Sequence, residues 1–285
     1  YPILRLNEFE SYFIKEPAKY CNIISQQQYE DLKLHKGDVL ICRTNGNPDF
    51  VGRAAVIMED FDYAFASYLF RVNVSDEITP EYFVAYLQSK YGRIEIDKNS
   101  MKGNQTNFSP AKLKDIKIPC FSNDFCLKIT DKFNRAYDFQ QCSKTDYKLA
   151  EKMLEENLGI KQSLNDTVSI KTLSESFNIS GRLDAEYYQP KYEQIENQIA
   201  SNNTVYNSCK IYDKNFNPND DIIYQYIELA NVDLMGGIAT PSSIIGKELP
   251  SRARRLVKTG QIIISSIEGS LQSCALITEE FDNAL

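Results

Sequence analysis

The sequence predicts an α+β fold in which two similar units of strands and short helices are separated by one long helix of the coiled-coil type. Three observations lead to this prediction. A strand-like segment occurs twice, short apolar runs broken by polar turns fill residues 1–121, and helical periodicity without glycine or proline fills residues 122–158. We therefore predict a first unit over 1–121, a spacer helix over 122–160 and a second unit over 161–285.

The repeat is a run of aliphatic residues between two glycines. The glycines are Gly37 and Gly46 in the first copy, and Gly260 and Gly269 in the second, 223 positions further on. After a three-residue difference in length the match resumes, with Phe61-Asp62 of the first copy answering to Phe281-Asp282 of the second. We infer a duplicated unit. A chain with two similar units is expected to recognise two similar targets at a fixed distance from each other.

The first unit is expected to begin with short strands. We predict strands over 39–42, 54–58 and 65–74, because each is an apolar run rich in β-branched or aromatic residues. Thr79, followed by proline, supplies an N-cap and a first helical residue, so a helix is expected to start there. That helix is expected to stop near Gly92.

The first unit is expected to close before a long spacer helix. Ser109 and the proline after it cap a short helical turn, and residues 113–119 are predicted to form a closing strand. From residue 122 to 158, apolar residues recur with helical period, which predicts a rod of about 54 Å at 1.5 Å per residue. A helix of that length cannot bury its apolar stripe in a small domain, so we expect it to pair with another helix.

The second unit repeats the opening of the first. Pro190 starts an amphipathic helix through Tyr192, Ile195 and Ile199, and a strand over 222–229 lines up with the start of the chain at the same offset of 223. The first copy thus lacks an opening segment, and the second stops soon after its 275–277 strand. We expect a fragment, or a partly ordered chain, of a longer two-unit protein.

The composition narrows the classes of function. The 285 residues carry a net charge of −7, with no apolar run long enough to span a membrane, and we expect no signal peptide. Seven scattered cysteines without C-x-x-C spacing are typical of a cytoplasmic protein with reduced thiols, and one histidine supplies no metal cluster. There is no P-loop, G-x-G-x-x-G, H-E-x-x-H or G-x-S-x-G motif, so we expect no catalytic site, metal or cofactor in this chain.

Two local regions are basic although the whole chain is acidic. Residues 90–117 hold seven basic and three acidic residues, and residues 247–258 hold five and one, so each has a net charge of +4. Lysine and arginine neutralise phosphates, whereas asparagine and glutamine pair with adenine in the major groove. Taken alone, either cluster is also compatible with an ordinary solvated face.

The polar segments beside the repeated strand complete the set of candidates, although a hairpin with polar tips would give the same pattern. The framework recurs in both copies while the polar residues differ, as expected for two readers of different sequences. The candidate DNA-binding residues are Arg43, Thr44, Asn45, Asn47, Lys102, Asn104, Gln105, Asn107, Arg252, Arg254, Arg255, Ser266 and Glu268.

The order and repetition of these motifs resemble the DNA specificity subunit of type I restriction–modification systems. In the first copy the resemblance lies in 52–55 (GRAA), 65–67 (FAS), 80–83 (PEYF) with Leu87, 105–107 (QTN), and 116–119 (IKIP) after Leu113. In the second copy it lies in 183–188 (LDAEYY), 227–232 (IELANV) and 250–255 (PSRARR) before Gly260. The departures are the incomplete second unit, the absence of a second long helix, and Gln261 at the position of Asp38.

The resemblance implies a fold and a set of partners. It implies two α/β target recognition domains, each reading half of a split site in double-stranded DNA, with long helices packed as an antiparallel coiled coil that sets the spacing. It also implies methyltransferase subunits that use S-adenosylmethionine, and a restriction or motor subunit for cleavage. Two alternatives stay open: the specificity region of a single-chain restriction–methyltransferase enzyme, and a protein-interaction scaffold that does not bind DNA.

Overall fold

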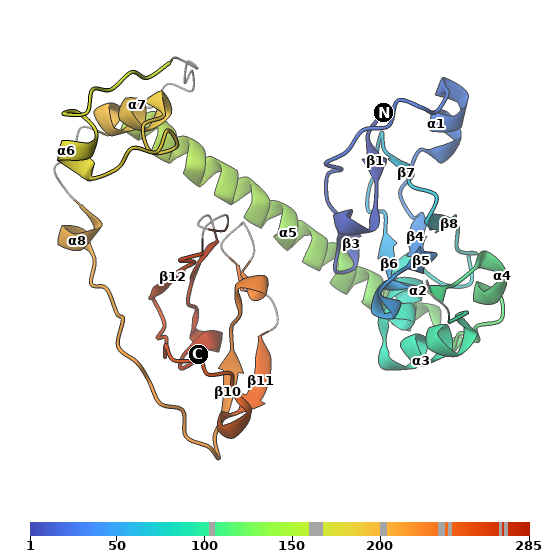
Figure 1. The fold of residues 1–285 in the computed structure, drawn as a ribbon. Coiled ribbons are helices and arrows are strands. Elements are labelled where there is room, and N and C mark those ends of the chain that lie inside the picture. The colour runs from blue at the N-terminus through green and yellow to red at the C-terminus, as the bar shows by residue number, and fades with distance from the viewer. Residues whose placement is uncertain are drawn as a thin grey trace. The chain divides into compact units, whose positions relative to one another are not determined.

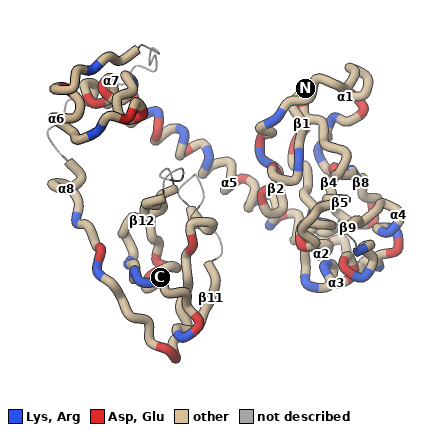
Figure 2. The backbone as a smooth tube through the Cα atoms, in the orientation of Figure 1, with Lys and Arg blue, Asp and Glu red and all other residues tan. Residues whose placement is uncertain are grey.

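The computed structural model describes residues 1–102, 106–159, 168–199, 204–232, 237–238, 241–267, 270 and 273–285. They form two compact units, Tyr1–Asp146 and Tyr147–Leu285, which we call the first and second units. The division falls inside the long helix α5, Asn123–Leu158, drawn in green in Figure 1. Basic and acidic residues are interspersed along both units (Figure 2).

The first unit contains three antiparallel strands in the order β6-β4-β8. Around them, β1 pairs in parallel with β7, β2 pairs with β3, and β5 pairs with β9. The strands are β1 (Ile3–Leu4), β2 (Phe9–Glu10), β3 (Phe13–Ile14), β4 (Val39–Cys42), β5 (Thr44–Asn45), β6 (Ala54–Val56), β7 (Ala64–Phe65), β8 (Leu69–Val72) and β9 (Thr106–Asn107). The helices before α5 are α1 (Gln26–Leu32), α2 (Pro80–Gln88), α3 (Lys90–Asn99) and α4 (Pro110–Leu113).

Strand β4 is buried on both faces, because successive side chains of a strand point to opposite sides. Val39 and Ile41 pack in a core with Phe83 and Leu87 of α2. Leu40 and Cys42 pack in a second core with residues of β1 and β6. The repeated strand is therefore the centre of the first unit.

Two predicted boundaries in the first unit differ from the structure. The strand predicted over 65–74 is divided into β7 and β8, since β7 pairs with β1 whereas β8 pairs with β4. The helix predicted to stop near Gly92 ends at Gln88, where Ser89 caps α3 by accepting a hydrogen bond from Gly92 N–H at 3.2 Å. Gly92 belongs to α3, and a Cβ there would lie 2.1 Å from the Tyr86 carbonyl oxygen. The residue therefore allows α3 to approach α2 closely.

The closing strand predicted over 113–119 is wrong. In these described residues there is a short helix end followed by irregular backbone, without strand pairing. Tyrosine hydroxyls of α2 bind the backbone instead: Tyr82 donates to the Pro119 carbonyl at 2.6 Å, and Tyr86 to the Lys117 carbonyl at 2.8 Å. The carbonyl groups thus find donors without a neighbouring strand.

Helix α5 occupies the interval predicted to be one helix. The Ser122 hydroxyl accepts a hydrogen bond from Phe125 N–H at 3.3 Å, and Gly159, with φ of +64°, follows the last helical residue. Within the first unit, Phe133 and Tyr137 pack edge-on against Phe13 at ring separations of 5.9 and 5.4 Å. Other apolar side chains on α5 are exposed, so pairing with a second helix stays a prediction.

The second unit contains two strand pairs and three short helices among its described residues. β10 (Ile223–Tyr226) pairs antiparallel with β11 (Ser242–Ile245), and β12 (Ile262–Ile264) with β13 (Cys274–Leu276). The helices are α6 (Phe177–Ser180), α7 (Pro190–Gln198) and α8 (Val205–Ser208). Helix α7 lies where the amphipathic helix was predicted.

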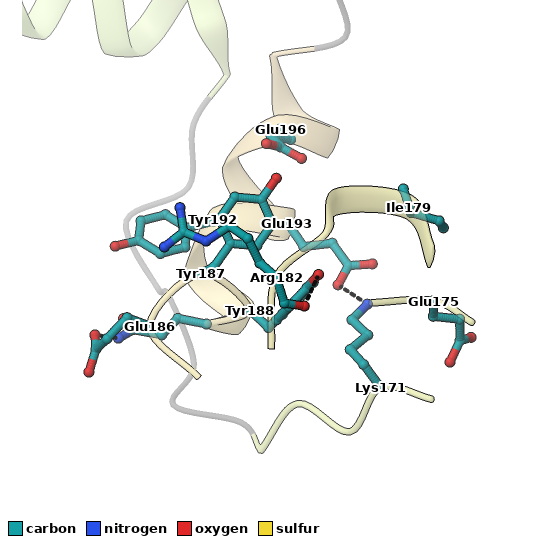
Figure 3. Close-up of a pocket in the computed structure, with 11 residues that line it drawn as sticks. Lys171, Glu175, Ile179, Arg182, Glu186, Tyr187, Tyr188, Tyr192, Glu193 and Glu196 are labelled. Carbon is teal, nitrogen blue, oxygen red and sulfur yellow. Dashed lines mark hydrogen bonds and ion pairs between the residues drawn. The ribbon is translucent and has the colours of Figure 1, made fainter. Parts of the chain in front are cut away.

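A polar hollow of about 760 Å³ lies among residues 171–196 of the second unit (Figure 3). Tyrosine rings line it, and its two cations are already ion-paired: Lys171 with Glu193 at 3.0 Å, and Arg182 with Asp184 at 2.6 Å. Both cations thus already have carboxylate partners, and we assign no function to the hollow.

Candidate nucleic-acid interface

The repeated hairpin has the same register in both units. In the first unit Val39, Leu40 and Ile41 of β4 lie opposite Val56, Ala55 and Ala54 of β6. In the second unit Ile262, Ile263 and Ile264 of β12 lie opposite Leu276, Ala275 and Cys274 of β13. The residue pairs correspond one to one, with an offset of 223 before the hairpin loop and 220 after it. The duplication inferred from the sequence therefore extends to the backbone pairing.

The turn that enters each hairpin is also repeated. Gly37 and Gly260 adopt φ of +89° and +81°, a region that favours glycine because it has no Cβ. Gly37 N–H donates to the Ile57 carbonyl, and Gly260 N–H donates to the Ile277 carbonyl, both at 2.8 Å. The glycine that marks each copy in the sequence thus has one structural role in both.

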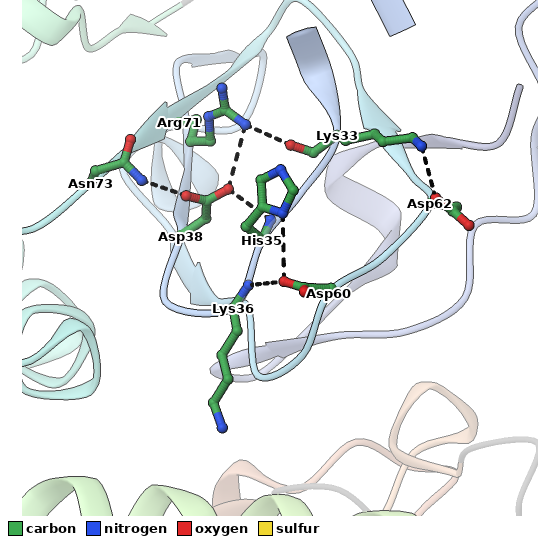
Figure 4. Close-up of polar contacts among 8 residues, drawn as sticks. All are labelled: Lys33, His35, Lys36, Asp38, Asp60, Asp62, Arg71 and Asn73. Atoms are coloured by element: carbon green, nitrogen blue, oxygen red, sulfur yellow. Dashed lines mark hydrogen bonds and ion pairs between the residues drawn. The ribbon is translucent and has the colours of Figure 1, made fainter. Parts of the chain in front are cut away.

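The difference between Asp38 and Gln261 is accommodated by one shared hydrogen bond. The Asp38 carboxylate accepts from His35 N–H at 2.9 Å, and the Gln261 side-chain oxygen accepts from Lys258 N–H at 2.8 Å. Asp38 is buried and also accepts from Asn73 Nδ2 at 2.5 Å and Arg71 Nη1 at 3.4 Å (Figure 4). Glutamine is thus the second copy's means of closing the same turn.

The match between copies beyond the hairpin needs one correction. The sequence comparison paired Asp62 with Asp282, but Asp60 is the residue that shares the hydrogen bond of Asp282. Lys36 N–H donates to Asp60 Oδ1 at 2.9 Å, and Thr259 N–H donates to Asp282 Oδ1 at 2.9 Å. A 3-10 turn at Glu279–Phe281 shifts the second copy by two residues.

The loops that leave the hairpin differ between the copies. In the first unit the loop contains the 3-10 helix Pro48–Phe50, whereas the second copy has three fewer residues between its strands. The Cys42 N–H bond to the Arg53 carbonyl, 2.8 Å, has its counterpart in Ser265 N–H to Ser273 at 2.9 Å. The backbone bonding of the hairpin is thus the same in both copies up to the loop, whereas the length and the polar residues of the loop differ.

The structure brings two candidate groups of the first unit together. Strands β5 and β9 place Thr44 opposite Asn107, and Asn45 opposite Thr106, although the segments are about 60 residues apart in sequence. The Thr44 hydroxyl also donates to the Thr106 carbonyl at 3.1 Å. We call residues 43–47 with Lys102, Thr106 and Asn107 the loop pair. Asn104 and Gln105 lie outside the described residues.

The polar side chains of the loop pair are partly engaged. The Asn45 side-chain oxygen accepts from Asn47 N–H at 2.8 Å, and that of Asn47 accepts from Asp49 N–H at 3.0 Å. Lys102 is ion-paired with Asp97 at 3.0 Å. Arg43 is exposed and has no side-chain hydrogen bond or ion pair within the described part of the chain. The amides therefore shape the turn, while Arg43 offers a charge to solvent.

The described candidates of the second unit are exposed, and most form side-chain hydrogen bonds or ion pairs. Arg252 is ion-paired with Glu228 at 2.7 Å, Arg254 donates to the Ser251 carbonyl, and Arg255 donates to Asn215. Ser266 is exposed, and no bond among the described residues joins it to these arginines. Glu268 lies outside the described residues.

Sequence reasoning missed two arginines in the first unit as individual candidates. Arg53 and Arg93 both contact the turn at residues 49–53, which follows the 43–47 segment of the loop pair. Neither is ion-paired with a carboxylate in the described ranges. Arg93 belongs to the basic stretch 90–117, and Arg53 belongs to the segment 52–55 that resembles the family. Both signals were present, but only the fold shows that the two arginines contact the same turn, residues 49–53.

The described residues contain neither a membrane-spanning helix nor a metal site. No helix there is both long and apolar enough to cross a membrane. No group of three or more histidine, cysteine, aspartate or glutamate side chains there is placed to hold a metal ion.

Comparisons with known proteins give a partial similarity to solved structures. No protein-family model matches the chain, and no curated protein matches it. Among solved structures, the crystal structure of the HsdS subunit from Thermoanaerobacter tengcongensis is similar at 26% sequence identity over 26% of this chain. The similar region spans 20% of that chain, with a TM-score of 0.25, which is too low to indicate a shared fold.

Proposed function

We propose that this chain is a sequence-specific DNA-binding subunit of a type I restriction–modification complex, without a catalytic site of its own. Each unit would read one half of a bipartite site, and α5 would set the distance between the halves. The assembly would be cytoplasmic, with methyltransferase subunits that use S-adenosylmethionine and a restriction or motor subunit as partners.

One observation carries the proposal. The hairpin has the same register and the same entry turn in both units, whereas the loop that leaves it differs in length and in polar residues. Base edges are read by side chains, and backbone scaffolds position those side chains. One scaffold with two different loops suits a protein that recognises two different half-sites.

The exposed arginines of both units favour DNA binding over a role in which α5 acts only as a protein-interaction scaffold. The candidates Arg43 in the first unit and Arg252, Arg254 and Arg255 in the second are exposed, as contacts with phosphates require. A scaffold that acted only through α5 would have no need of cations on both units. DNA binding no stronger than that of a neutral control protein would favour the scaffold instead.

The test is to map methylated adenines in DNA from cells that carry the complete system. The expected result is a split motif of two different halves separated by a fixed spacer. A control strain carries the same methyltransferase subunits and lacks this chain, and its DNA should lose the motif. Methylation at a continuous site, or a motif that persists in the control strain, would contradict the proposal.

A further inference from the structure

Two arginines of the first unit are held on one short turn, residues 49–53. Arg93 of α3 donates from Nη1 to the Val51 carbonyl at 2.8 Å and from Nη2 to the Asp49 carbonyl at 3.3 Å. The Arg53 guanidinium lies over the Phe50 ring, 4.1 Å from its centre. Both charged groups are therefore fixed relative to the loop pair, which begins one residue after β4.

The turn is held in place by close packing against α3 and by backbone hydrogen bonds to β4. Gly52 has φ of +74°, and a Cβ at this position would lie 2.5 Å from Cγ2 of Ile96. Gly52 N–H donates to the Cys42 carbonyl, and Cys42 N–H donates to the Arg53 carbonyl, both at 2.8 Å. A site whose groups are already positioned loses less entropy when it binds a ligand.

The two positive charges lack a full set of counter-charges. Both groups contact the same short turn, and the pKa of Arg93 is lowered, first by burial and then by the charge of Arg53. Burial raises the pKa of the adjacent Cys42 thiol to about 11, so that thiol is neutral at pH 7. Of the nearby carboxylates, Asp97 is ion-paired with Lys102, which leaves Asp49 to offset both arginines.

We propose that Arg53 and Arg93 bind one backbone phosphate of DNA beside the loop pair. This inference rests on the proposed function, because it takes duplex DNA as the ligand. Guanidinium groups match the geometry of phosphate oxygens, and such contacts fix the register of a protein on the duplex without reading its sequence. The phosphate would therefore anchor the first unit on the duplex beside the loop pair.

The site belongs to the first unit alone. Ser273 occupies the position of Arg53 in the second copy, as the matching hydrogen bonds to Cys42 and Ser265 show. The second copy instead carries Arg254 and Arg255 before its entry turn, at positions where the first copy has Asp31 and Leu32. The two units would thus hold the DNA backbone through different parts of the same scaffold.

The test uses Arg53→Ser, which installs the residue found in the second copy. Binding of the reconstituted complex to a duplex of random sequence is measured over a range of salt concentrations. Loss of one phosphate contact should reduce the slope of log K against log[salt] by about 0.9. Arg53→Lys should keep the slope, and so should the control Arg135→Ser, at an exposed arginine of α5.

Each outcome decides the matter. A reduced slope with an unchanged methylation motif supports the phosphate site, and Arg53→Gln provides the same measurement if the serine variant fails to fold. An unchanged slope in a folded variant overturns the site and leaves the proposed function intact. A changed motif shows a base contact and overturns the backbone assignment. A wild-type complex that has no split motif overturns the proposed function, and the inference with it.

Discussion

The substitution Asp38→Ala should destabilise the first unit much more than Gln261→Ala destabilises the second. Both residues close the entry turn of the repeated hairpin with one bond to a backbone N–H, at 2.9 and 2.8 Å. They differ in their surroundings, since Asp38 is 3% exposed, whereas Gln261 is half-buried. The pair is therefore a matched comparison inside one chain.

The magnitude follows from the donors that lose a partner. Removal of the Asp38 carboxylate leaves His35 N–H and the Asn73 amide without their acceptor at part-buried positions. A hydrogen bond to a carboxylate contributes about 1.5–3 kcal/mol, and less where water reaches the freed donor. Arg71 still donates to the carbonyls of Lys33 and Asp31, so the loss of its bond to Asp38 adds little to the cost. The expected cost is about 2–5 kcal/mol. In the second unit solvent replaces the lost acceptor for Lys258 N–H, and the expected cost is about 1 kcal/mol.

Hydrogen exchange followed by mass spectrometry separates the two units, because peptides that cover β4 and β12 report on each hairpin. A loss of about 3 kcal/mol corresponds to exchange roughly a hundredfold faster at β4, provided that exchange follows the opening equilibrium. Asp38→Ala should leave the β12 peptide unchanged, and Gln261→Ala should leave the β4 peptide unchanged. Equal effects of the two substitutions on their own hairpins would refute the burial argument.

Three further predictions concern packing, pH and spacing. Gly92→Ala should lower the free energy of unfolding, measured from denaturation curves by circular dichroism, by about 3 kcal/mol, because the new Cβ would meet the Tyr86 carbonyl oxygen. The control is Gly46→Ala, since nothing lies within 4 Å of a Cβ at that position. Since the pKa of Cys42 is raised from about 9 to about 11 in the folded state, its contribution to stability is complete below pH 9 and is lost as the pH rises toward 11. Denaturation curves should therefore show an alkaline loss of about 3 kcal/mol that is smaller in Cys42→Ala. Two helical turns inserted within residues 140–148, about 10.5 Å, should lengthen the spacer of the methylated motif by about 3 base pairs, and an unchanged spacer would exclude the ruler role.

The hydrophobic pattern was sufficient for the elements whose burial is regular. β4 is apolar at four successive positions because both of its faces are covered, and α5 has apolar residues at helical spacing on both sides of a polar middle, residues 140–148. The pattern failed at 113–119, where apolar residues alternate as in a strand but tyrosine hydroxyls satisfy the backbone. It also missed the break between β7 and β8, since a change of pairing partner leaves no trace in hydropathy.

The candidate site could be predicted only as separate segments. The polar residues after β4 and those near 102–107 were both identified, but their meeting depends on the pairing of β5 with β9, which no local pattern encodes. Arg53 was missed as a candidate because a single arginine after a glycine turn has no distinctive periodicity. Its significance comes from Arg93, which reaches the same turn from another helix.

The repeat separates the residues that maintain the hairpin from those that are free to change. The scaffold needs glycine at the entry turn and a side-chain oxygen on the next residue, which directly precedes the first paired residue of the hairpin. Aspartate supplies that oxygen in one copy and glutamine in the other. The loop after the strand is closed by the same backbone bond in both copies, Cys42 N–H to the Arg53 carbonyl and Ser265 N–H to the Ser273 carbonyl. Inside that bond the loop differs by three residues, and serine replaces Arg53 without altering the register. Under the proposed function, stability and recognition would be carried by different residues of the same unit. Such a scaffold would be able to acquire a new half-site in one copy while the other copy, and both hairpins, stay as they are.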